Sequence, residues 1–293
     1  MTINAIDLII PSRETSLGSF TVKRVLPFAK RRAVGPFIFL DHMGPHVFAP
    51  GLGLSVAPHP HIGLSTLTYL LEGRIIHRDS LGSVAEIHPG AVNWMTAGSG
   101  IAHSERSAEA DLDGEHRLNG LQLWIALPDD QEDCAPTFSH YPKATLPRLK
   151  LGECDCTVVA GTMQGKSSPV RTHSPLFFAD VLAPTNSHFA FDPDGHEIAV
   201  YIAQGAIQIS GQDVFAGQMV VLKSGSALQF RASLDTRAFV LGGEKLGREK
   251  HMWWNFVSSN REKIETAKRR WENDEYPPIP GESRFSRTPL PSA

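Results

Sequence analysis

Cysteine and long apolar runs are scarce in this sequence, and their scarcity narrows its class. The 293 residues include three cysteines, Cys134, Cys154 and Cys156. An odd and sparse count argues against a small secreted domain held together by disulfides. No apolar stretch approaches the ~20 residues that a membrane-spanning helix needs. The N-terminus has no basic segment followed by a long apolar run, so we expect a cytoplasmic protein with no membrane partner.

Charge of one sign is also lacking. The chain has 28 Lys and Arg residues against 31 Asp and Glu residues, which gives a net charge of −3. Such a balance supplies no general attraction for phosphate backbones, so we expect no direct binding of nucleic acid. A hydrophobic content of 41% with 20% charged residues is typical of a globular protein. The length predicts one or two domains, each large enough to bury its own core.

Two short motifs carry the residues that could perform chemistry. They are His59-Pro60-His61 and His103-Ser104-Glu105. If both lie on β-strands, residues two apart point to one face, about 6.6 Å from each other. Each motif alone is more often surface polarity than a ligand pair. Together they offer three imidazole nitrogens and one carboxylate oxygen, which is a ligand set for a divalent transition ion.

These motifs also resemble a known family. Gly53 before His59-Pro60-His61, and Gly90 leading through Gly98 to His103, resemble the two cupin motifs. The longer strings resemble the pirin family of bicupins, whose members hold one metal, usually iron, in the N-terminal barrel; these strings are His59–Gly63, Thr68–Gly73, His77–Gly82 and Trp94–Glu105. The resemblance implies that His59, His61, His103 and Glu105 are the metal ligands, and it extends over nearly the whole chain.

The region after His59 is predicted to be a barrel of short strands. Runs with strand-like composition alternate with Gly, Asp-Ser and Pro-Gly turns, and they are Leu64–Leu71, Arg74–His77, Ala85–His88, Ala91–Thr96 and Leu121–Leu127. If the first strand continues from His61 without a bulge, the residues facing the metal are Gly63, Ser65, Leu67, Tyr69 and Leu71. We therefore expect a largely apolar cavity lining.

Three positions depart from the pirin pattern. Ile62 and Ser65 stand where pirins commonly carry Arg and Glu, and Asn119 begins a run that often begins with His. The four ligand positions are unaffected. We expect the departures to bear on the mouth of the pocket and on substrate preference.

The second half of the sequence repeats the first without its ligands. Counting from the matched glycines Gly73 and Gly205, and from Gly90 and Gly217, the four ligand positions map onto Phe191, Pro193, Phe230 and Ala232. None of these coordinates a metal, so we expect one metal per chain. Residues 128–150, rich in proline and acidic residues, are interpreted as a packed linker between the halves.

The complete expectation is an all-β protein of two tandem antiparallel cupin (jelly-roll) barrels with a C-terminal amphipathic helix. The predicted domains are 1–132, which binds metal, and 133–293, which has no ligands and includes the helix and an extended tail. The helix is predicted over 260–273, with a capping box from Ser259 to Glu262 and an apolar stripe of Ile264, Ala267 and Trp271.

The resemblance implies two different functions. The first is a quercetin 2,3-dioxygenase-type enzyme that acts on a flavonol-like compound and dioxygen, with Glu105 as ligand and catalytic base. The second is a metal-dependent regulatory protein with a protein partner. A metal-dependent isomerase is less favoured, because the sequence shows no further acid–base pair. Iron, as Fe2+, is favoured by the family alone, since the same donors accept Mn2+, Co2+, Ni2+, Cu2+ and Zn2+.

Overall fold

The computed structural model describes residues 4–17, 20–283 and 286–291. Contacts divide the chain into two compact units. Unit 1 has the ranges 1–14, 23–42 and 144–246, and unit 2 has the ranges 15–22, 43–143 and 247–293. The units therefore exchange segments along the chain, and the C-terminal segment with the helix belongs to unit 2. A domain boundary between residues 132 and 133 stays a prediction.

Unit 2 contains a four-stranded sheet in the order β5-β10-β7-β8, made of β5 (Ser55–His61), β7 (Ile75–Asp79), β8 (Val84–Ile87) and β10 (Ile101–Arg106). A larger sheet begins with β12 (Thr137–Tyr141), β9 (Val92–Thr96), β6 (Leu64–Glu72) and β11 (His116–Ala126). It continues with β4 (Phe37–Phe48), β3 (Thr21–Leu26) and β2 (Arg13–Ser16), whose residues are divided between the two units. The barrel strands expected from Leu64 onward are confirmed.

A tight turn at Ile62 and Gly63 separates β5 from β6. Gly63 has a φ of +68°, and a Cβ at this position would lie 1.9 Å from the carbonyl oxygen of Val257. Only glycine fits such a turn. The chain therefore leaves the four-stranded sheet after His61 and enters the larger sheet at Leu64. The assumption of one continuous strand through this region is wrong.

Unit 1 is built on the same plan with apolar contents. Its large sheet has the order β1-β21-β18-β23-β16-β14-β13, with β15 paired to β14; the strands are β1 (Ile6–Pro11), β13 (Arg148–Leu151), β14 (Cys154–Met163), β15 (Lys166–Ser167), β16 (Leu176–Ala183), β18 (Glu197–Gln204), β21 (Gln218–Leu222) and β23 (Thr236–Gly243). A four-stranded sheet in the order β17-β22-β19-β20 consists of β17 (His188–Phe191), β19 (Ala206–Ile209), β20 (Gln212–Phe215) and β22 (Leu228–Ala232). Residues of both sheets share one hydrophobic core.

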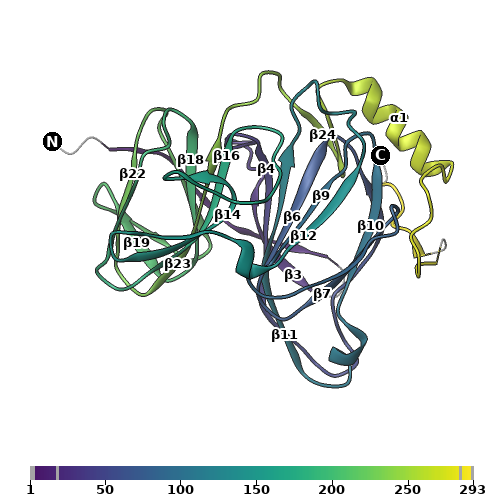
Figure 1. Ribbon diagram of the computed structural model, residues 1–293, viewed down its shortest axis with the longest axis horizontal. Coiled ribbons are helices and arrows are strands. Elements are labelled where there is room, and N and C mark those ends of the chain that lie inside the picture. The colour runs from purple at the N-terminus through teal and green to yellow at the C-terminus, as the bar shows by residue number, and fades with distance from the viewer. Residues whose placement is uncertain (1–3, 18–19, 284–285, 292–293) are drawn as a thin grey trace. The chain divides into compact units, whose positions relative to one another are not determined.

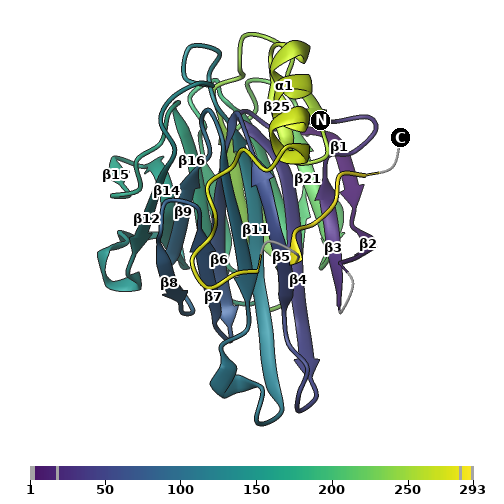
Figure 2. The same ribbon diagram turned by 90° about the vertical axis from the view of Figure 1, so that its right-hand side faces the viewer.

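The C-terminal helix forms as predicted, but its cap differs. Helix α1 (Arg261–Glu272) buries Ile264, Ala267 and Trp271, and it lies beside β24 (His251–Trp253) and β25 (Phe256–Ser258) in unit 2 (Figures 1 and 2). The N-cap residue is Asn260, whose side chain accepts a hydrogen bond from the backbone N–H of Glu262. The predicted capping box on Ser259 is therefore wrong, because the helix begins one residue later and either polar side chain could serve as cap.

The predicted linker also contains regular structure. Residues 128–150 include β12, the 3-10 helix η2 (Lys143–Thr145) and the start of β13, while a second 3-10 helix, η1 (Glu109–Asp111), lies before β11. Strand β12 pairs with β9 from Thr137 opposite Thr96 to Tyr141 opposite Val92. The frequent prolines hid this edge strand, where missing backbone donors are tolerated.

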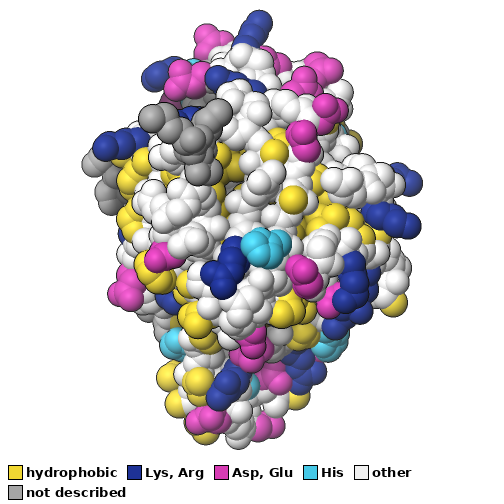
Figure 3. Space-filling view, turned by 90° about the vertical axis from the view of Figure 1, so that its left-hand side faces the viewer, with side chains coloured by type: hydrophobic (Ala, Val, Ile, Leu, Met, Phe, Trp, Pro, Cys, Tyr) yellow, Lys and Arg dark blue, Asp and Glu magenta, His cyan; other side chains and the backbone are white. Residues whose placement is uncertain are grey.

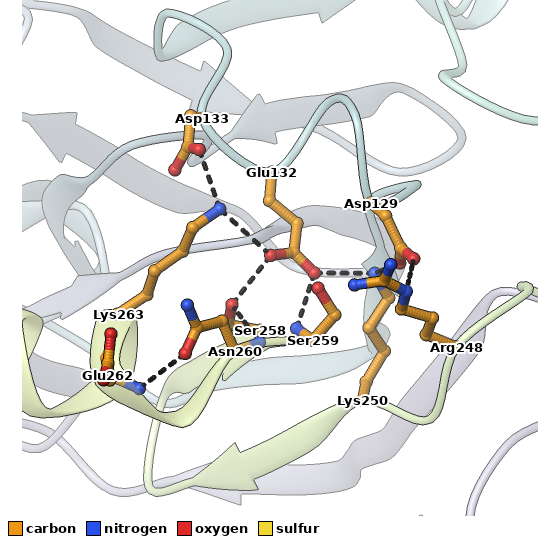
Figure 4. A network of polar contacts seen from close by, with 10 residues as sticks. All are labelled: Asp129, Glu132, Asp133, Arg248, Lys250, Ser258, Ser259, Asn260, Glu262 and Lys263. Carbon is orange, nitrogen blue, oxygen red and sulfur yellow. Dashed lines mark hydrogen bonds and ion pairs between the residues drawn. The ribbon is translucent and has the colours of Figure 1, made fainter.

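Buried Glu132 connects this segment to the start of α1 (Figure 4). Its carboxylate accepts hydrogen bonds from Lys250 Nζ at 2.6 Å, from the Ser258 hydroxyl at 2.7 Å and from the Ser259 N–H at 2.7 Å. Burial alone would raise the pKa of Glu132, but these bonds outweigh it and lower the pKa. The network fixes the residues before α1 to the chain that follows β11.

The C-terminal tail packs on the outer side of β5 and β10 (Figure 2). The carboxylate of Glu282 accepts hydrogen bonds from Ser104 at 2.9 Å and from Arg106 at 2.6 and 2.7 Å. The backbone N–H of Thr288 donates to the carbonyl of Pro58. Ser104 and Pro58 are the neighbours of His103 and His59, so the tail supports the two strands that carry the predicted ligands.

No helix among the described residues is long and apolar enough to cross a membrane. On the face shown in Figure 3, basic and acidic side chains are interspersed, and that face carries no extended basic patch. This agrees with the nearly balanced charge of the sequence.

Candidate metal centre

The four-stranded sheet of unit 2 brings the two histidine motifs together. In the antiparallel register His103 on β10 lies opposite His59 on β5, and Ile101 lies opposite His61. Cross-strand neighbours share a face of the sheet, so the three histidines point to the same side. Their ring centroids are 4.3 Å apart for His59 and His103, and 5.0 Å apart for each of the other two pairs.

Backbone carbonyl groups orient two of these rings. The Nδ1–H of His59 donates to the carbonyl of Ala57 at 2.9 Å, and the Nδ1–H of His61 donates to the carbonyl of Asn255 at 3.2 Å. A carbonyl oxygen only accepts, so in the neutral rings both Nε2 atoms carry a lone pair. Nε2 of His61 lies 3.1 Å from Nε2 of His103. The three imidazoles thus direct nitrogens to one place.

Burial favours the neutral form that coordinates metal. Desolvation lowers the pKa of His59 to about 4, although its bond to Ala57 acts in the opposite direction. Desolvation, with the nearby histidines, lowers the pKa values of His61 and His103 well below their usual range. At neutral pH all three rings are uncharged, and a neutral imidazole is the metal-binding form.

Glu105 lies in an adjacent group. His59, His61 and His103 each offer a ligand atom within 4.8 Å of the others, and so do His77, His103 and Glu105. The ligand atoms of the four predicted ligands therefore do not all lie within 4.8 Å of one another, and His103 belongs to both groups. A bulge between His103 and Glu105 shifts the register on β5, and Glu105 lies opposite His77 on β7. Burial raises the pKa of the Glu105 carboxyl to about 7.

The residues present fit a transition metal. Two buried imidazole nitrogens face each other at 3.1 Å, and a cation bound between them would relieve the repulsion between their lone pairs. The Nδ1–H bonds of His59 and His61 fix the ring orientation in the way that carbonyl groups support histidine ligands in metal sites. The donor set of imidazoles with a nearby carboxylate suits iron, manganese, cobalt, nickel, copper or zinc.

Sequence reasoning missed His77 and Asp79. Both are buried, and His77 Nε2 lies 3.2 Å from Asp79 Oδ2, while His77 Nδ1 lies 3.4 Å from His103 Nδ1. A signal was present, because His77 and Asp79 are two apart, as His59 and His61 are, but the predicted strand ended at His77 and the structure extends it to Asp79. The acid–base pair that the sequence did not reveal is therefore next to the histidine cluster.

In the larger sheet, the side chains that face the histidine cluster are the alternate set to the one that was predicted. Trp124, Thr66, Met95 and Phe138 form one cross-strand row over β11, β6, β9 and β12. The Trp124 ring lies 5.1 Å from the His61 ring, and Phe138 stacks on His77 at 4.3 Å. The next row on the same face is polar, with Gln122, Thr68, Asn93 and His140.

The predicted inward set is therefore wrong, and the lining combines a mainly apolar row beside the histidines with a polar row next to it. Ser65 and Leu67 alternate with Thr66 and point to the other face, where Ser65 contacts the Thr96 hydroxyl at 3.0 Å. The turn at Gly63 adds the shift of one position that reverses the face. The departure at Ser65 consequently lies on the side of β6 that faces away from the histidines.

Two family models match the chain. The pirin model covers residues 19–125, and the pirin C-terminal cupin domain model covers residues 178–277. A pirin-like protein of Caulobacter vibrioides is 46% identical over 270 residues, which span 91% of this chain and 93% of that protein. This chain belongs to the pirin family.

Solved structures agree with the membership of this pirin-family chain. The crystal structure of quercetin 2,3-dioxygenase from Acinetobacter baumannii has a TM-score of 0.90 with 35% identity, and the match covers 98% of this chain and 95% of that one. The bacterial pirin YhhW of Escherichia coli, in complex with nickel(II), has a TM-score of 0.65 with 17% identity over 82% of this chain and 99% of that one, which shows the fold alone. The all-β fold with two cupin-type barrels and one C-terminal helix is confirmed.

Proposed function

We propose that this pirin-family chain is a metal-dependent dioxygenase of the quercetin 2,3-dioxygenase type, acting on a flavonol-like substrate. The observation that carries the proposal is the convergence of three buried, neutral imidazoles on one point in the barrel of unit 2. The similarity to quercetin 2,3-dioxygenase of Acinetobacter baumannii over nearly the whole chain supports the choice of reaction.

In this proposal His59, His61, His103 and Glu105 hold one divalent ion per chain, and Fe2+ is the metal that the family favours. When bound, such an ion supplies Lewis-acid binding of the deprotonated substrate and its activation toward dioxygen. The remaining work falls to the chain. Glu105 accepts the proton of the substrate hydroxyl, a role open to a buried carboxylate at the site. Trp124 and Phe138 cover the histidine rings and exclude water.

The test is oxygen uptake and loss of quercetin absorbance with protein purified without oxygen and loaded with Fe2+, then with Mn2+, Co2+, Ni2+, Cu2+ and Zn2+ in turn. We expect turnover with at least one metal. Turnover should fall by more than about 100-fold in His59→Ala, since a ligand is lost, and by about 10²- to 10⁴-fold in Glu105→Gln, since a general base is lost. Exposed His88→Ala is the matched control and should keep full activity.

The regulatory alternative predicts a different outcome. A protein that works through a partner would take up stoichiometric metal and consume no oxygen across a panel of flavonols, with or without Glu105. That result would contradict the enzyme proposal. It would leave metal-dependent capture of a protein partner as the activity to measure, with His59→Ala as the variant that fails. A cytoplasmic location remains part of the proposal.

A further inference from the structure

A line of three buried side chains leads away from the histidine cluster. His103 Nδ1 lies 3.4 Å from Nδ1 of His77, and His77 Nε2 lies 3.2 Å from Oδ2 of Asp79. His103 lies opposite Asp79 in the register between β10 and β7, so all three residues are on the inner face. Phe138 stacks on His77 with an interplanar angle of 12°, which holds the plane of that ring.

Asp79 is held so that it acts as an acceptor. Its Oδ1 accepts hydrogen bonds from the backbone N–H groups of Leu81 at 2.8 Å and Ser83 at 3.0 Å, which leaves Oδ2 for His77. Burial alone would raise the pKa of Asp79, but the bonds from His77 and Ser83 outweigh it and lower the pKa. An ionised carboxylate has no proton to donate, so Nε2 of His77 carries the hydrogen.

The direction of the remaining bonds follows from this one. If His77 carries a single ring hydrogen, the one that Asp79 accepts from Nε2, then Nδ1 of His77 is an acceptor and Nδ1 of His103 is the donor. A neutral His103 with its hydrogen on Nδ1 has a free lone pair on Nε2. The opposite arrangement is also available locally, since Nε2 of His61 is an acceptor 3.1 Å from Nε2 of His103 and could take a hydrogen bond from it. The two neighbours of His103 therefore compete for its single proton.

We propose that Asp79, acting through His77, is the positioning residue that keeps Nε2 of His103 free of hydrogen and ready to bind a cation. His77 transmits the constraint, and neither residue needs to touch the metal. This inference rests on the metal site of the proposed function and not on the reaction. A carboxylate that orients a ligand imidazole commonly contributes about 10- to 100-fold to metal affinity.

Asp79→Asn is the most informative variant. It replaces one carboxylate oxygen with an NH2 group and so exchanges the donor and acceptor roles along the line from residue 79 through His77 to His103. The backbone N–H groups of Leu81 and Ser83 hold the oxygen of the new amide in the place of Oδ1. The amide NH2 must then face His77 and donate to its Nε2. His77 becomes a donor through Nδ1, His103 becomes an acceptor through Nδ1, and the hydrogen of His103 moves to Nε2, where it blocks the metal.

The first measurement uses the full-length metal-free protein at pH 7.5. Long-range 1H–15N spectra distinguish the two tautomers of a histidine. We expect the Nδ1–H form for His59, His61 and His103 in the wild type, and the Nε2–H form for His103 in Asp79→Asn. A wild-type His103 in the Nε2–H form would overturn the inference, and this result does not depend on any variant folding.

The second measurement is Zn2+ and Co2+ affinity by competition with a chelator. We expect Asp79→Asn to bind each metal about 10- to 100-fold more weakly, and the exposed control Asp113→Asn to bind as the wild type does. A double-mutant cycle with His77→Phe tests the route. If Asp79 acts through His77, adding Asp79→Asn to His77→Phe should cost no further affinity.

Fully additive losses of metal affinity in that cycle would overturn the proposed action of Asp79 through His77, which we call the relay. A general structural role for Asp79 would be independent of His77. Failure of the proposed function is distinguishable from failure of the relay. Suppose that the protein binds Zn2+, shows the Nδ1–H form of His103 and loses affinity in Asp79→Asn, but never consumes oxygen with a flavonol. This result would contradict the proposed reaction and support the relay.

Discussion

The two four-stranded sheets share a strand order and a register but differ in what they place on the inner face. In unit 2 the order is β5-β10-β7-β8, with His103 opposite His59 and Glu105 opposite His77. In unit 1 the order is β17-β22-β19-β20, with Phe230 opposite Phe189 and Ala232 opposite Ile207. The same backbone thus presents either a group of histidines that could hold a metal or an apolar filling.

This register also corrects the mapping made by counting residues. Phe230 and Ala232 do correspond to His103 and Glu105, but the residues that correspond to His59 and His61 are Phe189 and Phe191, not Phe191 and Pro193. The connection from Phe191 to β18 is longer than the one from His61 to β6, so counting back from the glycine misplaces the strand by two residues. Phe189 and Phe230 stack at 4.8 Å where unit 2 has two imidazoles.

The largest effect, on metal affinity, should come from giving the four-stranded sheet of unit 2 the aromatic residues of the corresponding sheet in unit 1. His59→Phe with His103→Phe recreates the pair of stacked rings found in unit 1, so we expect the barrel to fold and metal affinity to fall by more than about 100-fold. Elemental analysis and circular dichroism give the two readouts. Stoichiometric metal in the folded double variant would show that the ligands lie elsewhere.

The reverse change probes the apolar sheet. Phe230→Ala leaves a cavity in the core of unit 1 and should lower the free energy of unfolding by about 3–5 kcal/mol, with metal content unchanged. Phe215→Ala, an exposed phenylalanine on β20, is the control. Urea unfolding measures both. A loss of metal in Phe230→Ala with the fold intact would break the separation of roles between the two sheets.

A smaller effect should come from the polar network that fixes α1 in unit 2. Glu132→Gln removes one of the two carboxylates that bind Lys250 and leaves Asp129 as the other, so we expect a loss of about 1–3 kcal/mol at pH 7. The pKa of Glu132 is lower in the folded state than its usual 4.5. Its stabilisation is therefore complete above the unfolded value and is lost as the pH falls through the folded value.

Unfolding by urea at pH 7 and at pH 3.5 tests this dependence. Glu132→Gln should narrow the difference in stability between the two pH values, whereas Glu115→Gln at an exposed position should leave it as in the wild type. An equal pH dependence in Glu132→Gln and the wild type would mean that Glu132 does not titrate with folding.

The smallest effect concerns the helix cap. Asn260→Ala removes the side-chain oxygen that accepts from the Glu262 N–H and should cost about 1 kcal/mol. Ser259→Ala is the matched comparison, since Ser259 contacts Glu132 through its backbone N–H. Thermal unfolding ranks the two. A larger cost for Ser259→Ala would restore the capping box expected from the sequence.

Features that follow from residue patterns could be predicted from the sequence alone. The alternation of short β-runs and turns predicted the barrels. The two histidine motifs predicted the approach of His59, His61 and His103, and the matched glycines predicted that the second half lacks ligand residues. The apolar spacing of Ile264, Ala267 and Trp271 was enough for α1. These features could be predicted because each depends on residue types and on spacings that are counted along the sequence.

Features set by register and by packing between distant segments could not be read in this way. The turn at Gly63 packs against the carbonyl of Val257, far along the chain, in space that a Cβ would need, and that turn decides which face of β6 lines the site. The approach of His77 to His103 and the stacking of Phe138 on His77 depend on pairings across three strands.

The sequence by itself determined that one barrel carries a cluster of histidines that could hold a metal, that the other barrel lacks it and that a C-terminal helix follows, since residue type and spacing fix what a strand or helix can present. Only the tertiary structure decided how the site is built around the ligands, with Asp79 and His77 behind His103 and Thr66, not Ser65, facing the cluster. The physical reason is that a shift of one residue reverses the face of a strand, and such shifts are fixed by contacts between segments far apart in the chain.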